Sequence, residues 1–358
     1  MAIATIPQRA MSEQGFSFRN LIINGDMSIA QRGTSFTGQT SGAYYLDRFK
    51  TDISGLGTWT ITQSTDVPSG QGFNKSMKFD CTTADASPSA GDFLYLNQPI
   101  EGYNTQSFKF GTANAESLTL SFWVKSNKTG TYIVRFYDID NGRALSQSYT
   151  ISSASTWEKK TITISGDTVS GPNYDNGYAF AINWCLGAGT NYTSGTLNTS
   201  WNSVTSADQF VGQVNLADST DNEWYITGVQ LEAGTTASDF EFLPYDVNYR
   251  RCQRYYEKNA GYTGFFASNS AHLRVPMVVP KRTQSPSISW SNSPMTVLIY
   301  GSGAEGSNSG SSGTDQRSIS FANDAHHIRL LNMTGTGVSN GLGCILTDSQ
   351  YVIIDAEL

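Results

Sequence analysis

Few residues in this sequence have the types and the spacing that enzymatic catalysis requires. Histidine most often exchanges protons near neutral pH, and the three histidines, His272, His326 and His327, all lie in the C-terminal part of the chain. No serine occupies the Gly-x-Ser-x-Gly pattern that presents a nucleophile between a strand and a helix. The acidic residues fall mostly in turn sequences, where Asp is favoured because its side chain bonds the local backbone. We therefore predict that the protein is not an enzyme.

Calcium binding is the metal chemistry that the carboxylates suggest. The stretch Asp138-Ile-Asp-Asn-Gly-Arg resembles the start of a calcium loop, but Tyr149 stands where such a loop needs a bidentate Glu, and a hairpin turn explains the stretch. A second candidate joins Asp26, near the first predicted strand, to Glu232 on the last strand of the first domain. These carboxylates meet only if the two strands are neighbours. We expect no cofactor, apart from a structural calcium ion that Asp26 and Glu232 would bind.

Three aromatic residues are candidates for glycan binding. Trp184, Tyr192 and Trp201 flank or lie within residues 187–209, which are rich in Gly, Thr, Ser and Asn and are predicted to form a long loop. Trp and Tyr can stack on a sugar ring, because each combines an apolar face with a polar group. The same rings can instead pack the loop against its domain, and the sequence leaves both alternatives open.

Composition and charge favour an all-β protein that does not bind nucleic acid. Of the 358 residues, 38% are hydrophobic and 15% are charged, while small polar residues, Gly and Tyr are abundant, which suits strand faces and turns. The net charge of -7 and the lack of a basic block argue against phosphate binding. No apolar run could span a bilayer, and the N-terminus lacks the apolar core of a signal peptide. We expect synthesis in a cytoplasm without classical secretion, and no membrane insertion.

The pattern of hydrophobic residues divides the chain into four parts. Residues 1–17 have no periodicity and are predicted to be an attachment arm, whose apolar side chains dock on a partner: Ile3, Ile6, Met11 and Phe16. Residues 18–245 contain about nine or ten predicted strands and are predicted to form a β-sandwich. Residues 246–260 carry aromatic residues at helical spacing and are predicted to be a linking helix. Residues 261–358 are predicted to form a second, smaller β-sandwich-like domain.

Two turn dipeptides mark particular elements inside residues 18–245. Leu21-Ile-Ile is predicted to be a short buried strand that ends in a turn at Asn24-Gly25. Asn141-Gly142 is predicted to turn a hairpin between residues 131–138 and 144–151. The domain closes with an alternating strand that begins at Glu223.

Several motifs, taken in their order, resemble those of known proteins. Asn20-Leu-Ile-Ile-Asn-Gly-Asp-Met, Leu120-Ser-Phe-Trp-Val-Lys and Gly228-Val-Gln-Leu-Glu-Ala-Gly-Thr-Thr-Ala-Ser-Asp-Phe resemble jelly-roll domains of the carbohydrate-binding-module type. Together with Tyr249-Arg-Arg-Cys-Gln-Arg-Tyr-Tyr and the terminal Asp-Ala-Glu-Leu, they resemble tailed-bacteriophage virion proteins, commonly tail-fibre or head-fibre subunits. The similarity runs from Asn20 to Leu358.

The resemblance implies a jelly-roll fold and a structural protein on the tail or head surface of a virion. The first hypothesis is a homotrimeric fibre or adhesin subunit, whose N-terminal arm contacts other virion proteins and whose β domains bind a host-surface glycan. The second is a capsid-decorating or cement protein with a purely structural role. A glycan depolymerase is a third hypothesis, disfavoured by the lack of catalytic residues. The resemblance assigns no sugar site, because such sites vary within this fold.

Overall fold

The computed structural model describes residues 18–260, 263–267, 270–276, 278–283, 286–290, 296–300, 308–309, 318–322, 325–330, 343–346 and 351–358. The chain forms two compact units, the first ending at Tyr249 and also including Leu358, and the second running from Arg250 to Glu357. The predicted attachment residues (Ile3, Ile6, Met11 and Phe16) lie outside the described residues. Their role therefore stays a prediction.

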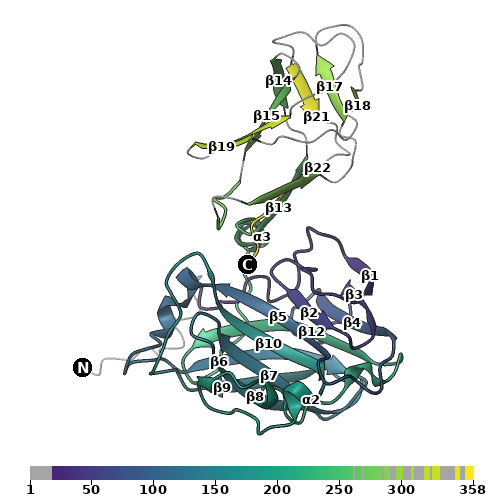
Figure 1. The fold of residues 1–358 in the computed structure, drawn as a ribbon, viewed down its shortest axis with the longest axis vertical. Coiled ribbons are helices and arrows are strands. Elements are labelled where there is room, and N and C mark those ends of the chain that lie inside the picture. The colour runs from purple at the N-terminus through teal and green to yellow at the C-terminus, as the bar shows by residue number, and fades with distance from the viewer. Residues whose placement is uncertain are drawn as a thin grey trace, which may run out of the picture. The chain divides into compact units, whose positions relative to one another are not determined.

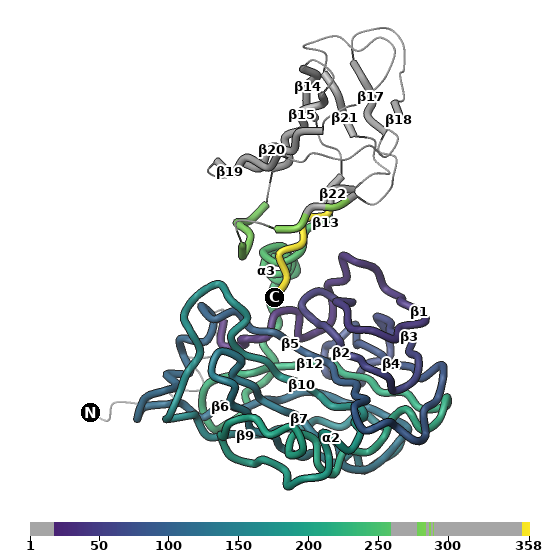
Figure 2. Tube along the Cα trace, in the orientation of Figure 1, coloured from purple at the N-terminus to yellow at the C-terminus, as the bar shows by residue number. Residues whose placement is uncertain are grey.

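Two six-stranded antiparallel sheets make up the first unit (Figure 1). One sheet has the order β1 (Ser35–Gln39), β3 (Thr58–Ser64), β4 (Ser76–Thr83), β12 (Glu223–Ala233), β6 (Leu118–Ser126) and β9 (Glu158–Ile164). The other has the order β11 (Asn202–Ser203), β8 (Arg143–Ile151), β7 (Gly130–Asp138), β10 (Tyr178–Ala188), β5 (Phe93–Glu101) and β2 (Lys50–Ser54). The course of the chain through both sheets can be followed in Figure 2.

Helical structure in the described residues is short. The connections hold η1 (Gly102–Phe108), α2 (Thr190–Thr193), η2 (Ser206–Asp208) and η3 (Leu216–Asp218), and α3 (Tyr245–Gln253) follows the sandwich. No helix in the described part of the chain has both the length and the apolar character needed to cross a membrane.

Strand alternation builds one apolar core between the two sheets. Ile182 and Trp184 of β10 are buried from one sheet, and Leu120 and Phe122 of β6 from the other. The rings of Phe122 and Trp184 meet edge to face, with centroids 5.9 Å apart. Because side chains alternate along a strand, the residues between these point to the outer faces of the sheets. The packed sheets confirm the predicted all-β jelly-roll sandwich.

The segment after residue 18 differs from the prediction, because Leu21–Ile23 form no strand. The segment instead bonds to β12: Leu21 N donates to Leu231 O (3.0 Å), and Val229 N donates to Gly25 O (2.9 Å). A bulge in β12 separates these contacts from regular pairing, with Gly228 at a φ of +61°. Regular ladder bonds on this edge of β12 are thus replaced by a docked segment.

The predicted turn at Asn24-Gly25 is confirmed, and the structure shows why it needs glycine. A Cβ atom on Gly25 would lie 2.1 Å from the backbone oxygen of Val229, so a side chain there would push the turn off β12. The Asn24 side chain closes the turn from inside, since its Oδ1 accepts from Ile29 N (2.8 Å) and its Nδ2 donates to the oxygens of Ile29 and Asp47 (both 2.9 Å).

The hairpin predicted at Asn141-Gly142 is also confirmed, as the connection between β7 and β8. Asp138 pairs with Arg143 at the end of the ladder, and Gly142 takes a φ of +60°. The Asp138 carboxylate accepts hydrogen bonds from the backbone and side-chain nitrogens of Asn141. These residues serve the turn, as the sequence indicated.

The linking helix is shorter than predicted. It spans Tyr245–Gln253, and the last residues of the expected 246–260 helix form strand β13 (Tyr256–Ala260). The Asn248 side chain accepts from Asn24 N and donates to Asp26 Oδ1 (both 3.2 Å), so the start of α3 belongs to the first unit. The predicted boundary at residue 245 therefore falls within an element shared by both units, since a helix can end one core and lead into the next.

The second unit is also β-rich. A three-stranded sheet has the order β13, β22 (Tyr351–Asp355) and β16 (Ser287–Trp290). A seven-stranded sheet has the order β18 (Asn308–Ser309), β17 (Thr296–Tyr300), β21 (Gly343–Leu346), β14 (Thr263–Ala267), β15 (Ser270–Pro276), β20 (Ala325–Leu330) and β19 (Ser318–Ala322).

The docking of the N-terminal segment depends on Asn20, which leads to a stability prediction. Asn20 Oδ1 accepts from Ile22 N (3.0 Å) and Leu231 N (3.1 Å), and Nδ2 donates to Val229 O (3.1 Å). Asn20→Ala should lower the free energy of unfolding by about 3 kcal/mol, because buried backbone groups lose their partners. Urea unfolding measures the change.

Asn202→Ala is the matched control, because its side chain bonds only locally and at the surface. We expect its effect to stay within about 0.5 kcal/mol. Equal effects of the two substitutions would contradict the docking role of Asn20.

Candidate functional site

Two of the three predicted glycan-binding residues lie in the core, which corrects that prediction. Trp184 has 0% exposure because its place in β10 directs the ring between the sheets. Trp201 has 9% exposure, packs edge-on against Phe110 at 5.5 Å, and donates from Nε1 to Ser165 O (2.7 Å). Neither ring is open to a sugar. The alternative of loop packing is the correct one for both.

Tyr192 is placed differently from the two tryptophans. It lies in α2, half-buried, with its ring edge-on to Phe93 at 5.5 Å. A small outer cluster formed by Ile133, Cys185 and Phe210 packs against it. Tyr192 thus borders the outer face of the β10 sheet, although the expected three-residue platform does not form.

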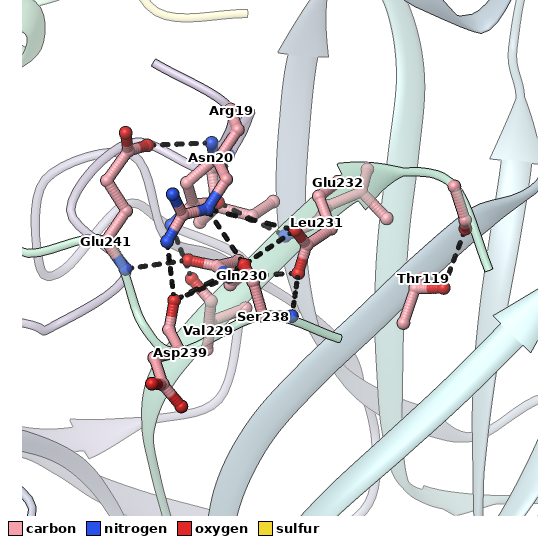
Figure 3. Close-up of polar contacts among 12 residues, drawn as sticks. Arg19, Asn20, Thr119, Val229, Gln230, Leu231, Glu232, Ser238, Asp239 and Glu241 are labelled. Atoms are coloured by element: carbon pink, nitrogen blue, oxygen red, sulfur yellow. Dashed lines mark hydrogen bonds and ion pairs between the residues drawn. The ribbon is translucent and has the colours of Figure 1, made fainter. Parts of the chain in front are cut away.

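The predicted calcium ligand Glu232 is held in a hydrogen-bond network of its own (Figure 3). Its carboxylate accepts from Ser238 N (2.9 Å), Ser238 Oγ (2.8 Å) and Gln230 Nε2 (3.0 Å). Arg19 Nε lies 3.9 Å from the carboxylate and donates to Ser238 Oγ (2.8 Å). The network joins β12 to two segments, one at Arg19 before the first strand and one at Ser238 after β12.

Gln230 links this network to a second carboxylate. Gln230 Oε1 accepts from Glu241 N (2.9 Å), and Glu241 Oε2 in turn accepts from Asn20 N (2.9 Å). All three side chains are nine-tenths buried or more. Their arrangement joins the chain segments at residues 20, 230 and 241, as Figure 3 shows.

The other predicted calcium ligand, Asp26, has different partners. Its Oδ1 accepts from Ser28 Oγ (3.1 Å) and Asn248 Nδ2 (3.2 Å). Within the part of the chain that the structure describes, no group of three or more His, Cys, Asp or Glu residues is placed to hold a metal ion. Asp26 and Glu232 therefore accept hydrogen bonds from different residues, and a calcium ion bound by both stays a prediction.

A more promising site lies on the outer face of the sheet that contains β2, β5, β10, β7 and β8, which run side by side in Figure 1. The pairing register aligns one residue from each of these strands in a row across the sheet: Lys50, Asn97, Asn183, Arg135 and Ser146. The neighbouring row carries Asp52 and Tyr95. These residues alternate with the core residues of the same strands, so they face outward.

Arg135 is at the centre of this outer face. Its Nε and Nη2 donate to Asn183 Oδ1 (2.9 and 2.7 Å), and its Nη1 donates to Gln209 Oε1. The guanidinium carbon lies 4.8 Å from the ring centroid of Tyr137, 5.2 Å from that of Phe210 and 5.5 Å from that of Tyr95. Cation–π contacts at this range hold the guanidinium in place. The centre of the face is therefore rigid and polar.

A second polar group lies on the β2 side of Arg135. Asn97 Nδ2 donates to Asp52 Oδ2 and to Tyr178 Oη (both 2.9 Å), and Lys50 Nζ lies 3.0 Å from Asp52 Oδ1. The rings of Tyr95, Tyr137 and Tyr178 are each half-buried, so part of each ring reaches the surface. Fixed amides beside partly exposed rings are what recognition of a polar ring compound requires.

Two tyrosines of this face, Tyr95 and Tyr178, have a raised pKa. Burial raises the pKa of Tyr95 to about 12, although the charge of Arg135 opposes the rise. Burial also raises the pKa of Tyr178, against the hydrogen bond from Asn97. Both phenols are therefore neutral at physiological pH and can both donate and accept hydrogen bonds.

The sequence analysis missed this face because its polar residues alternate with apolar ones, which is also the pattern of an ordinary solvated strand. The available signal is the type of the outward residues. The outward positions of β7 and β10 include Arg135, Tyr137 and Asn183, whereas those of β9 include Thr161 and Thr163. Only the pairing register shows that they come together.

No protein-family model matches the sequence, and no curated protein matches it. Among solved structures, the chain is similar to the enzymatically active domain of tailspike protein 4 of bacteriophage CBA120 (16% identity, TM-score 0.32), over 60% of this chain and 22% of that one. It is also similar to a family 11 carbohydrate-binding module from Clostridium thermocellum in complex with a mixed-linked tetrasaccharide (13% identity, TM-score 0.27), over 57% of this chain and 99% of that one. The chain thus spans about a fifth of the length of the tailspike chain.

The polar partners of Glu232 lead to a prediction about metal removal. Ser238 and Gln230 already satisfy the Glu232 carboxylate, so the first unit should not need a bound cation for stability. A chelator of divalent cations should leave the melting temperature unchanged, whereas a drop reversed by added calcium would show that a cation stabilises the fold. Differential scanning calorimetry measures this.

The raised pKa of Tyr95 leads to a prediction about alkaline stability. In the unfolded chain a tyrosine ionises near pH 10, whereas folded Tyr95 holds its proton until about pH 12. The contribution of the Tyr95 proton to the free energy of unfolding is therefore fully present below pH 10 and is lost as the pH rises from about 10 to 12. Tyr95→Phe should lose less stability than the wild type across this range, by up to about 2 kcal/mol.

The measurement is urea unfolding of both proteins at a series of pH values. Between pH 7 and pH 9 the difference between them should stay constant, which serves as the internal control. Parallel losses above pH 10 would contradict the proposed burial of the Tyr95 phenol.

Proposed function

We propose that this chain is a non-enzymatic virion protein that binds a host-surface glycan on the outer face centred on Arg135. The observation that carries the proposal is the combination on one sheet of three half-buried tyrosines with the amides of Asn97 and Asn183, which are themselves buried and fix the side chains of this face. The rings around the Arg135 guanidinium keep this face rigid, which suits a binding role.

The chemistry of this face suits a saccharide. A sugar ring has an apolar face of C–H groups and an edge of hydroxyls, so it is bound by aromatic rings together with amide donors and acceptors. Asn183 and Asn97 are already held by hydrogen bonds to Arg135 and Tyr178. Little side-chain freedom remains to be lost when a ligand binds, and this favours affinity.

The virion role in this proposal is supported by the sequence motifs from Asn20 to the C-terminus, which resemble those of phage fibre proteins. In the proposal the chain is a subunit of a homotrimeric fibre or adhesin, attached to other virion proteins through residues 1–17. The competing hypothesis, a cement protein with a structural role alone, gives a different expectation: the outer face would bind no saccharide.

The proposed glycan site is tested by Tyr137→Ala. Tyr137 offers a half-buried ring beside Arg135, and its removal should weaken binding to host envelope polysaccharide about tenfold. Tyr103→Ala is the control, because Tyr103 is 52% exposed in η1, which lies outside the assigned rows. Binding to isolated host envelopes and to a saccharide array is measured, with melting temperatures to confirm folding.

Three results would contradict the proposal. If wild-type protein binds no saccharide and no host envelope, the cement role is favoured. If Tyr103→Ala alone weakens binding, the glycan site lies on the loop edge of the sandwich. Release of soluble sugar from the envelope would show enzymatic activity.

A further inference from the structure

Arg135 is a buried cation without a carboxylate partner in the described part of the chain. Arg135 has 6% exposure, and its guanidinium donates hydrogen bonds to the neutral amide oxygens of Asn183 and Gln209. A guanidinium has five N–H groups, and these contacts use three of them. The Tyr95 hydroxyl offers the guanidinium a further neutral acceptor, so none of these acceptors carries a negative charge.

Two other cations with little exposure pair with a carboxylate, whereas Arg48, with 1% exposure, donates to the backbone oxygen of Pro99. Arg143 forms a two-point ion pair with Asp167. Lys281 pairs with the buried carboxylate of Glu257. A buried charge is stable when an opposite charge accompanies it, and removal of that partner is strongly destabilising. Arg135 differs from Arg143 and Lys281, because its hydrogen-bond partners are neutral.

The nearest carboxylate in the two rows does not supply the missing charge. Asp52 lies 3.0 Å from Lys50 Nζ and accepts a hydrogen bond from Asn97. The charges of Lys50 and Asp52 offset one another, so among the residues of these two rows the charge of Arg135 is left without a counter-charge. The three rings around the guanidinium attract the cation but do not neutralise it.

We propose that Arg135 is an anion subsite, which selects glycans that carry an acidic group. This inference rests on the proposed function and specifies its substrate class. The planar fork of a guanidinium matches a carboxylate in two-point geometry, and it also binds sulfate and phosphate groups. The partner chemistry is therefore a carboxylated, sulfated or phosphorylated saccharide.

Gln209 occupies the place of the ligand oxygen when the site is empty. Its Oε1 accepts from Arg135 Nη1, and the residue follows η2 in the connection between β11 and β12. Gln209 N donates to Ser206 O over a long distance (3.4 Å), while its neighbours Asp208 and Phe210 are bonded through the backbone to Asn198 and Tyr192. A side-chain rotation of Gln209 exposes Nη1 to an incoming anion, which replaces a neutral acceptor with a charged one.

Gln209→Glu is the decisive variant, because it supplies a carboxylate to Arg135 from within the chain. It has the same shape as the natural residue and should raise the melting temperature by about 2–4 °C. It should also weaken binding to acidic saccharides about tenfold or more, because the internal carboxylate competes for the guanidinium. Gln106→Glu is the matched control, since it adds the same charge at an exposed position of η1.

The probes are immobilised oligosaccharides in matched pairs, each a uronic acid oligomer and the same oligomer reduced to its neutral sugar. Sulfated and phosphorylated forms of the neutral oligomers identify which anion is preferred. Wild-type protein should bind acidic members about tenfold more tightly than their neutral partners. Gln209→Glu should abolish that preference, and Gln106→Glu should keep it.

The outcomes separate this inference from the proposed function. Equal binding of acidic and neutral members, or an unchanged preference in Gln209→Glu, would overturn the anion subsite and leave glycan binding in place. Binding to no member of the array would overturn both. Arg135→Gln provides a second test where it folds, and there the acidic preference should be lost while neutral sugars still bind.

Discussion

The first unit depends on how the backbone N–H and C=O groups of β12 find hydrogen-bond partners beyond its bulge, on the edge that faces β4. Strand β4 pairs with β12 over Glu223–Ile226, and after Gly228 the N-terminal segment takes over that edge. Buried N–H and C=O groups must be paired, and here a side chain does much of the pairing because the segment is not a strand. The Asn20 side chain makes two bonds to β12 and one to Ile22 N of the docked segment. The sandwich is closed here by a side-chain amide together with two backbone bonds, not by a regular ladder.

This arrangement explains the motifs that recur around Asn20 and Gly228. Gly25 permits close approach to Val229, and the carboxylates of Glu232 and Glu241 fix the segments on either side. Asn248 ties the start of α3 to the same place. These motif residues stabilise the closed sandwich. Motifs of this kind therefore indicate the fold type and carry little information about a ligand.

The outer face of the other sheet, which contains β10, takes no part in this closure of the sandwich. Its rows are built from strands whose other side is core, so Trp184 and Asn183, adjacent in β10, point to opposite sides of the sheet, and both are buried. A rigid core behind the face keeps Arg135, Asn183 and the tyrosine rings in fixed positions. The whole chain has a formal net charge of -7, which disfavours indiscriminate anion binding. Under the proposal, the buried guanidinium of Arg135 is therefore a selective feature.

The sequence by itself determined the all-β class, the hairpin at Asn141-Gly142 and the turn at Asn24-Gly25, because alternation and turn chemistry are local properties. It did not determine that Leu21–Ile23 would dock without forming a strand, since that depends on a bulge in β12 two hundred residues away. The glycan candidates Trp184 and Trp201 were misplaced for the same kind of reason: a large aromatic residue serves equally well in a core or on a surface. Only the register of five strands brings Lys50, Asn97, Asn183 and Arg135 into one row. Registers are set by long-range packing, which no local pattern records.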